Sequence, residues 1–500
     1  ELDKEIWAHL LETVLSTLLV NTLVMLLGVG LIVSFVGVSL AWLTAVCDFP
    51  GRKFFDWALM LPLAMPTYVI AFVMVGLLDY SGPLQSALRN VLGSSFLLPE
   101  VRSAGGVVFV LSLVLYPYVY MFARSAFLSQ GRGLLDAARV LGLGPWMGFY
   151  KVALPMARPA IAGGVALALM EASADFGAVS VFNYDTFTTA IYKTWYGFFN
   201  IHAAGQLASL LLMFVVGALW LERRSRGKAR YHQEGQKHRI QLTGWQAWTA
   251  MLFCLLVLSG AFIIPVLKLL LWVGLHRFSD LDAGYVRLLG NSLGLAALAG
   301  SVTVGLAFLL ALIKNSYSWP LVSPLVQWAT LGYALPGSIL AVGIMLSFAF
   351  IDRGLHQLYL GLGIESGFYL VGGVLALILA YVVRFMAVAY GAIDSSFEQI
   401  RPSVIEAARS LGVSWQKLLG RVYLPLLRPG LLTAILLVFV DVMKDMPATL
   451  LLRPFGWDTL AVRVYEMTSE GEWERAALPG ITLVLAGLIP VLLLVRRSAK

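Results

Sequence analysis

The chain has 500 residues, of which 59% are hydrophobic and only 13% are charged. This composition leaves too little polar surface to cover a water-soluble globule, so it indicates an integral membrane protein. The formal net charge of +8 does not predict a nucleic-acid partner, because the basic residues occupy short loops between apolar segments, where they mark membrane topology.

Eleven apolar segments are predicted to cross the membrane. Eight of them are free of charge and long enough to span the ~30 Å of hydrocarbon. Three more carry one ionisable residue each, namely Glu171, Arg384 and Asp441. In chain order the eleven segments are 14–46, 57–78, 105–123, 159–173, 203–221, 242–267, 288–313, 319–351, 367–393, 429–443 and 476–495.

The chain contains two copies of one unit. Counterparts lie 270 residues apart and include polar and turn residues, which shared hydrophobicity does not explain. Direct repeats of this kind place their copies around an axis along the membrane normal, with the transport pathway between them. The matches include Asn21 with Asn291, Pro66 with Pro336, Arg139 with Arg409, Arg158 with Arg428 and Asp175 with Asp445, and, after a three-residue insertion, Asp185 with Asp458 and Tyr192 with Tyr465.

A basic polar stretch separates the two copies. We therefore predict a first unit at 1–222, a linker at 223–244 and a second unit at 245–500. Positive charge marks the cytoplasmic side, so the linker and the C-terminus are expected there. The second copy has six predicted spans and the first has five, and we expect the missing helix upstream of Glu1, which gives twelve spans in all.

Each copy contains a long loop that reads as a short helix, a glycine turn, a second short helix and a Leu-Pro pair. In the second loop, Ser403 and Glu406 have the spacing of a capping box. Trp415, Leu418, Leu419 and Val422 then form an apolar ridge, and Pro425 is expected to end that helix. Two such loops on the cytoplasmic side suit a protein that engages two identical partners, although a helix pair that only packs on the bundle is the alternative.

These loops resemble the EAA loop of ABC importer permeases of the binding-protein-dependent, MetI-like family. The resemblance covers both halves of the chain and departs from the pattern at Asp136, where Glu is usual. The residues that carry it are Asp136, Ala137, Ala138, Gly142, Leu154 and Pro155 in the first copy, and Glu406, Ala407, Ala408, Gly412, Leu424 and Pro425 in the second.

The resemblance implies an all-α fold, the tandem duplicated type I ABC importer transmembrane domain. It also implies that the chain lies in the bacterial inner membrane, among lipid, with two copies of an ABC ATPase and a periplasmic or lipid-anchored substrate-binding protein as partners. ATP and Mg would be bound by the ATPase, because this chain has no phosphate-binding loop: its Gly227-Lys228 pair is followed by Ala229. No cofactor is expected in this chain, no metal site is firmly assigned, and nothing in it predicts an enzyme.

Four acidic residues are candidates for the substrate pathway. Glu171 and Asp441 each follow an arginine by thirteen residues, which places them ~20 Å up a helix and inside the membrane. A carboxylate there costs about 2.5–3.5 kcal/mol, so it should face the bundle interior or water. Asp175 and Asp445 follow one turn later. An ion pair with Lys444 is the alternative role for the acids of the second copy.

Two stretches resemble the ferric-iron branch of the family, and acidic residues suit a hard metal cation better than an oxyanion. The two stretches are 174–192 and 441–449. Fused permeases for thiamine, polyamine, sulfate or molybdate share the loops and remain alternatives, and an ion-coupled secondary transporter is a further one. The aromatic segments 188–200 and 462–473 are expected to lie at the outer membrane interface.

Overall fold

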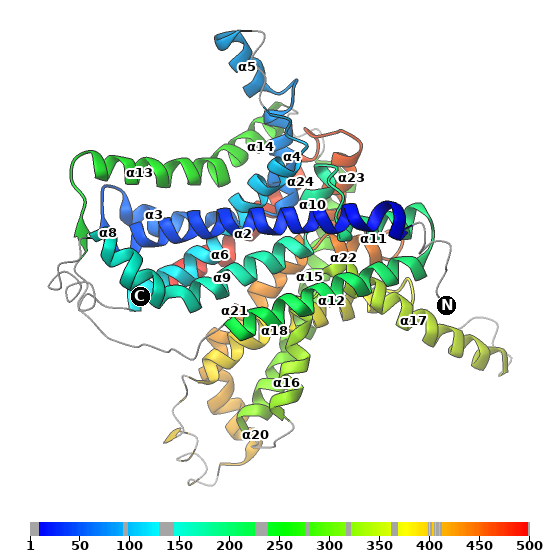
Figure 1. The fold of residues 1–500 in the computed structure, drawn as a ribbon. Helices are drawn as coiled ribbons and strands as arrows, with labels where there is room; N and C mark the ends of the chain where they lie inside the picture. Colours follow the sequence, from blue (N-terminus) through cyan, green and yellow to red (C-terminus); the bar gives the residue numbers. More distant parts are fainter. Residues whose placement is uncertain are drawn as a thin grey trace. The chain divides into compact units, whose positions relative to one another are not determined.

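The computed structural model describes residues 10–93, 99–129, 145–225, 239–275, 281–316, 322–361, 369–398, 400, 403–404, 406, 410 and 413–498. Helices make up almost all of this part of the chain (Figure 1). By contacts the chain forms two compact units. The first comprises 1–278, 464–491 and 495–500, and the second comprises 279–463 and 492–494. This grouping is separate from the division by repeat, so the predicted boundaries at 222 and 245 stay a prediction.

The first unit contains both termini and the helices that follow the linker. Its elements are η1 (Leu10–Val14), α2 (Leu15–Val46), β1 (Cys47–Asp48), α3 (Arg52–Ala58), η2 (Leu61–Ala64), α4 (Thr67–Leu78), α5 (Pro83–Leu92), α6 (Ala104–Ser129), α8 (Pro145–Gly148), η3 (Phe149–Ala153), α9 (Leu154–Ala174), α10 (Gly177–Val181), α11 (Phe187–Tyr192), η4 (Lys193–Gly197), α12 (Ile201–Ser225), β2 (Ile240–Gln241), α13 (Trp245–Leu258), η5 (Ser259–Ile263), α14 (Ile264–Leu275), the second part of α23 (Leu460–Ser469) and most of α24 (Ala477–Ser498).

The second unit repeats the central part of this order. Its elements are α15 (Ala283–Ser316), α16 (Val322–Thr330), η6 (Leu331–Ala334), α17 (Gly337–Gly361), α18 (Val374–Phe397), α20 (Trp415–Leu418), η7 (Leu419–Tyr423), α21 (Leu424–Lys444), α22 (Pro447–Leu452) and the start of α23.

The described residues include nine helices that are long and apolar enough to cross a membrane. Two shorter apolar helices, Ile201–Gly217 and Ala477–Leu493, accompany them. Each of the eleven predicted segments overlaps one of these helices, which confirms the all-α membrane class. Because two of the helices are short, the number of crossings stays a prediction.

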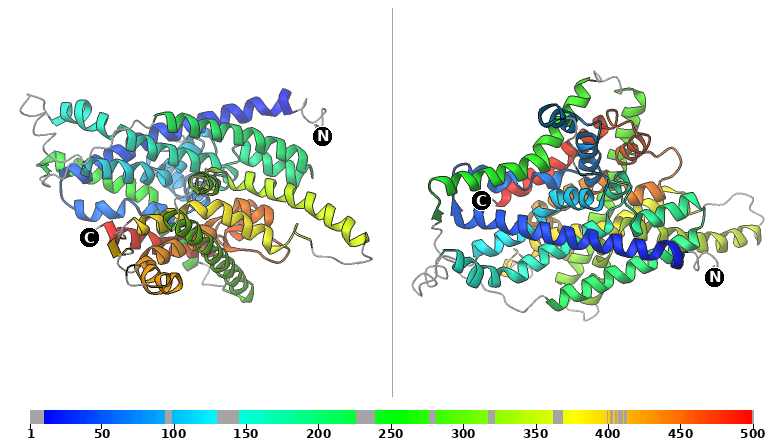
Figure 2. Two further views of the ribbon diagram at one scale, coloured as in Figure 1. Left: turned by 90° about the horizontal axis from the view of Figure 1, so that it is seen from below. Right: turned by 45° about the horizontal axis from the view of Figure 1, so that its top comes forward.

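Three helices of the first unit pack side by side, and they keep this arrangement in both views of Figure 2. α2 and α9 both contact α6. A side chain at Gly37 of α2 would lie 2.7 Å from the Val119 Cβ, and one at Gly164 of α9 would lie 2.8 Å from the Val119 Cα. Gly37 and Gly164 therefore both lie against Val119 and let the backbones of α2 and α9 approach α6 closely. Small residues allow membrane helices to pack in this way. In the second unit, α15, α18 and α21 pack on one another in the same way.

Two predicted spans are interrupted. The segment 57–78 was expected as one span, but α3 and η2 precede a break, and α4 begins only at Thr67. The segment 319–351 breaks at the matching place, before α17. Met65 and Leu335 are extended, with ψ of 121° and 128°, because the residue before a proline avoids the helical region. The segments 57–78 and 319–351 are apolar throughout, so their hydropathy did not reveal the breaks that Pro66 and Pro336 impose.

A small parallel sheet joins the described end of the linker to the residues that follow α2. Cys47 pairs with Ile240 and Asp48 pairs with Gln241. The Leu242 amide donates to the Asp48 carbonyl at 3.0 Å, and the Gln241 side chain donates to the Asp48 carboxylate at 3.0 Å. The described end of the linker is therefore fixed to the first unit, which the sequence did not predict.

Candidate functional site

The predicted coupling loops lie partly outside the described residues. Seven of the predicted coupling residues fall outside the described residues. They are Asp136, Ala137, Ala138 and Gly142 of the first loop and Ala407, Ala408 and Gly412 of the second. The five coupling residues that the structure describes are Leu154, Pro155, Glu406, Leu424 and Pro425.

Each Leu-Pro pair directly follows a π-helical turn. The Leu154 amide bonds to the Phe149 carbonyl, and the Leu424 amide bonds to the Leu419 carbonyl, both five residues back. Proline has no amide hydrogen and clashes with the carbonyl four residues earlier, and the wider turn accommodates it. The expectation that Pro425 ends its helix was therefore wrong: the chain stays helical from Trp415 to Lys444.

The described part of the second loop has a buried side and an exposed side. Leu418 and Tyr423 are each 1% exposed, and the Tyr423 ring lies 5.7 Å from the ring of Phe397 at the end of α18. Glu406 is exposed, and Trp415 is 40% exposed. Of the predicted apolar ridge, Leu418 is buried, Leu419 and Val422 are half-buried and Trp415 is exposed, and the contact to α18 is made by Tyr423 beside the ridge.

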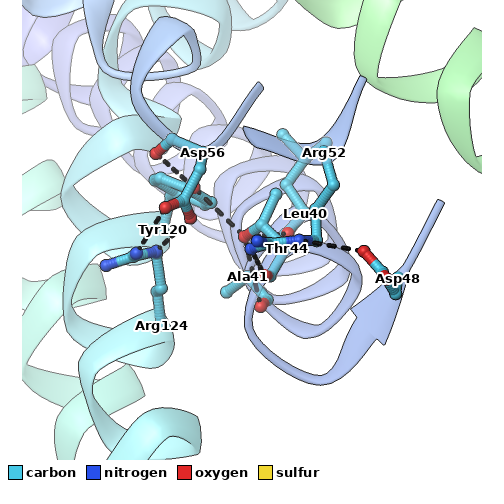
Figure 3. A network of polar contacts seen from close by, with 8 residues as sticks. All are labelled: Leu40, Ala41, Thr44, Asp48, Arg52, Asp56, Tyr120 and Arg124. Carbon is cyan, nitrogen blue, oxygen red and sulfur yellow. Dashed lines mark hydrogen bonds and ion pairs between the residues drawn. The ribbon is translucent and has the colours of Figure 1, made fainter. Parts of the chain in front are cut away.

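A polar network ties the helix ends beside the first coupling loop (Figure 3). Arg124, near the end of α6, donates two hydrogen bonds of 2.7 Å to the two carboxylate oxygens of Asp56 in α3. The Tyr120 hydroxyl donates to the Asp56 carbonyl at 3.0 Å and lies 3.1 Å from the Thr44 hydroxyl of α2. Arg52 reaches the Thr44 carbonyl at 3.2 Å. Three helix ends therefore meet directly before the loop.

The second repeat has a network at the matching place. Asp394, near the end of α18, accepts from the Lys314 ammonium at 2.8 Å and from the Asn315 amide at 3.2 Å, both on α15. Sequence reasoning missed both networks. The available signal was that the repeat offset of 270 aligns Arg124 with Asp394, a charged residue in each copy.

The candidate acid Asp175 lies where α9 breaks. Its carboxylate accepts hydrogen bonds from the amides of Ala178 at 2.9 Å and Val179 at 3.2 Å, and so caps the start of α10. The Thr67 hydroxyl donates to the same carboxylate. Every one of these partners is uncharged, although Asp175 is only 8% exposed.

Asp445 lies at the equivalent break between α21 and α22 and has a charged partner. Its carboxylate accepts from the Thr449 amide at 3.3 Å, and the Arg384 guanidinium lies 3.4 Å away. The Asp445 side chain is buried, at 1% exposure, and the Arg384 side chain is largely buried, at 14%. The counterpart of Thr67 is Gly337, where an added Cβ would lie 2.1 Å from the guanidinium. Gly337 therefore leaves the space that Arg384 occupies.

Glu171 and Asp441 lie one turn before these breaks, and both are half-buried. Glu171 is within electrostatic range of Asp175, and Asp441 is within range of Lys444. The proximity of Lys444 agrees with the ion-pair alternative for the second copy. The ring of four acids stays a prediction. Among the described residues, no group of three or more His, Cys, Asp or Glu side chains is placed to hold a metal ion.

The aromatic segments 188–200 and 462–473 contribute a cluster that the sequence did not predict. The Tyr192 and Tyr465 rings, counterparts in the two repeats, lie 6.1 Å apart in a T-shaped pair. Phe176, next to Asp175, contacts both at 5.0 and 5.5 Å. Burial and the neighbouring Tyr192 raise the pKa of Tyr465 above its usual range, so its phenol keeps its proton.

Comparisons with known proteins identify the family of this chain. The profile of the family "Binding-protein-dependent transport system inner membrane component" matches residues 34–223 and 303–499, one match in each repeat. The chain is 26% identical over 494 residues to the Fe(3+)-transport system permease protein FbpB 2 of Haemophilus influenzae. The aligned region covers 97% of this chain and 91% of that protein.

Other relatives match over one repeat. The molybdenum transport system permease protein ModB of Escherichia coli is 30% identical over 34% of this chain and 71% of its own length. The solved bacterial alginate ABC transporter, in complex with its alginate-bound periplasmic protein, has a chain that covers 49% of this chain and 91% of its own length, with 17% identity and a TM-score of 0.42. The two family matches together span most of the sequence, and this chain therefore belongs to the binding-protein-dependent inner membrane components, the permease subunits of ABC transporters.

Proposed function

We propose that this chain is the transmembrane pathway of an ATP-driven importer for ferric iron. The observation that carries this proposal is the similarity to a ferric permease over 97% of the chain. The molybdenum permease also matches, over about a third of this chain and 71% of its own length, and it indicates an alternative cargo. The half-buried and buried acids Glu171, Asp175 and Asp441 add a chemical argument, because carboxylates suit a hard cation better than an oxyanion.

The partners follow from the family. We propose that two copies of an ABC ATPase engage the two coupling loops and that a periplasmic binding protein delivers the cargo. We also propose that the linker and the C-terminus are cytoplasmic, which puts the coupling loops on the same side as the ATPase. The networks beside the loops join the helix ends that the ATPase would have to move.

We propose that the pathway passes the Tyr192–Tyr465 pair. These residues are counterparts in the two repeats and they touch, and counterparts related by a two-fold axis meet on that axis. The pathway of a directly repeated transporter runs along the same axis. The pair and Phe176 would then form a constriction that must open for cargo to pass.

The test is uptake into proteoliposomes that contain this chain, its ATPase and external binding protein. We expect ATP-dependent uptake of radioactive ferric iron that vanadate abolishes and uncouplers leave unchanged. Molybdate and sulfate serve as matched alternative cargoes under the same conditions. Uptake of either oxyanion without iron uptake contradicts the iron proposal but keeps the permease, whereas uptake that responds to uncouplers and not to vanadate contradicts ATP-driven transport.

A further inference from the structure

The residue at one repeat position carries opposite charge in the two copies, yet it forms an ion pair in both. Arg124 in the first repeat and Asp394 in the second are counterparts at the offset of 270. Arg124 pairs with Asp56, and Asp394 pairs with Lys314. We call Arg124–Asp56 and Asp394–Lys314 the loop-base pairs, because each lies on the last turns of the helix that enters a coupling loop.

The two pairs are built from different parts. In the first repeat the partner comes from α3, and both oxygens of Asp56 bond to the guanidinium. In the second repeat the partner is Lys314 of α15, which occupies the position of Thr44 in α2. Tyr120 still contacts Thr44, so α6 remains joined to α2 by a neutral hydroxyl contact. The repeats thus retain the connection between helix ends while the residues that make it differ.

Partial burial separates the first pair from ordinary surface ion pairs, and fixed geometry separates both. The side chains are 17% and 27% exposed in the first pair, whereas in the second Asp394 is 16% exposed and Lys314 is 39% exposed. Bidentate contact in the first pair and a second donor, Asn315, in the other fix the geometry. Exposed single pairs contribute little, but fixed and partly buried ones hold their helices in one arrangement.

We propose that the loop-base pairs are positioning elements for energy coupling. Each pair holds the end of α6 or α18 to its neighbouring helix, so that displacement of a coupling loop moves the packed helices together instead of bending one helix end. α6 contacts α2 and α9, and α18 contacts α15 and α21, so motion at either helix end reaches its whole helix group. This inference rests on the proposed function, because it requires an ATPase at the loops.

The experiment uses the complete assembly of chain, ATPase and binding protein in liposomes. Arg124→Gln and Asp394→Asn break one pair each, and the reversed pairs Arg124→Asp with Asp56→Arg, and Asp394→Lys with Lys314→Asp, restore attraction with exchanged charges. Arg475→Gln is the matched control, because it removes an ion pair of 2.8 Å to Glu472 outside the coupling loops. The readout is the ratio of ATP hydrolysis with binding protein to hydrolysis without it, and it requires no knowledge of the cargo.

We expect each single variant to assemble, to hydrolyse ATP without binding protein at or above the wild-type rate, and to lose about fivefold or more of the stimulation ratio. Each reversed pair should recover most of the loss, and the control should match wild type. Unchanged stimulation in both single variants overturns the inference, as does a reversed pair that assembles but stays as uncoupled as the single variant. A wild-type assembly that shows no stimulation instead contradicts the proposed function itself.

Discussion

Replacement of Arg384 by valine should destabilise the second repeat, because it leaves the Asp445 carboxylate buried without a counter-charge. Asp445 is 1% exposed, and Arg384 supplies the only charged partner within 4 Å that the described residues show for it. Removal of one member of a buried ion pair costs about 3–5 kcal/mol. Valine is the residue that the first repeat has at this position, at Val114, so its shape is compatible with the helix packing.

The first repeat indicates how the loss can be reversed. There the Thr67 hydroxyl bonds to Asp175, and Thr67 is the counterpart of Gly337. Gly337→Thr alone should also destabilise, because its Cβ would lie 2.1 Å from the Arg384 guanidinium. In the Arg384→Val background the clash with the guanidinium is removed, the Ala448 backbone nitrogen remains 3.2 Å from the added Cβ, and the threonine hydroxyl has a carboxylate to bond. A hydrogen bond to a charged group contributes about 1.5–3 kcal/mol, so the double variant should recover roughly half of the loss.

The measurement is the thermal stability of the purified chain in detergent, for the wild type, the two single variants and the double variant. The substitution Gly337→Thr should lower the melting temperature when Arg384 is present and raise it in the Arg384→Val background. Such a change of sign arises only if the two side chains compete for the same space beside Asp445. A double variant no more stable than Arg384→Val would refute the idea that Thr67 and Arg384 have equivalent roles.

Three further predictions test packing, reactivity and the pathway. Gly37→Leu or Gly164→Leu should each cost about 1–3 kcal/mol or more in a thermal-stability assay, since either side chain would overlap Val119, whereas Gly217→Leu, with open space around it, should be nearly neutral. Burial raises the pKa of Cys47 to about 12, so in a Cys254→Ser background a maleimide should label it slowly at pH 8 and rapidly after denaturation; fast labelling of the native chain would contradict its burial. Glu171→Gln combined with Asp441→Asn should reduce iron uptake, and undiminished uptake by a stably inserted double variant would remove both acids from the pathway.

The repeat and most helices could be predicted because they depend on properties that the sequence displays directly. Charge-free runs of membrane length identified the apolar helices, and the shared offset aligned Asn21 with Asn291 and, after the insertion, Asp185 with Asp458. The structure gives this match a physical reason: the Asn21 amide donates to the Asp185 carbonyl at 2.9 Å, and the Asn291 amide donates to the Asp458 carbonyl at 3.1 Å. Identical residues were retained there because they make identical bonds.

The features that escaped prediction depend on contacts between distant residues or on local backbone geometry. The apolar run 57–78 shows no polar interruption, so hydropathy did not reveal the break that Pro66 imposes. The π turns before Leu154 and Leu424 let the helices continue past Pro155 and Pro425, where proline was expected to end one of them. Arg384 can lie close to Asp445 because Gly337 has no side chain. The sequence shows a glycine in an apolar segment, but it does not show which neighbouring side chain fills the space beside it.

Comparison of the two repeats separates what the fold requires from how each copy supplies it. The break at Asp175 and Asp445 keeps the acid and changes its partner from the Thr67 hydroxyl to the Arg384 guanidinium. The helix end at Arg124 and Asp394 keeps an ion pair and reverses its charge. Two copies that diverged from one unit had the chance to lose either interaction, and both copies still have it with different residues. The fold therefore requires a partner for the buried acid and an ion pair beside the coupling loop, but not particular residues. A substitution at these positions should be tolerated when a second substitution restores the interaction.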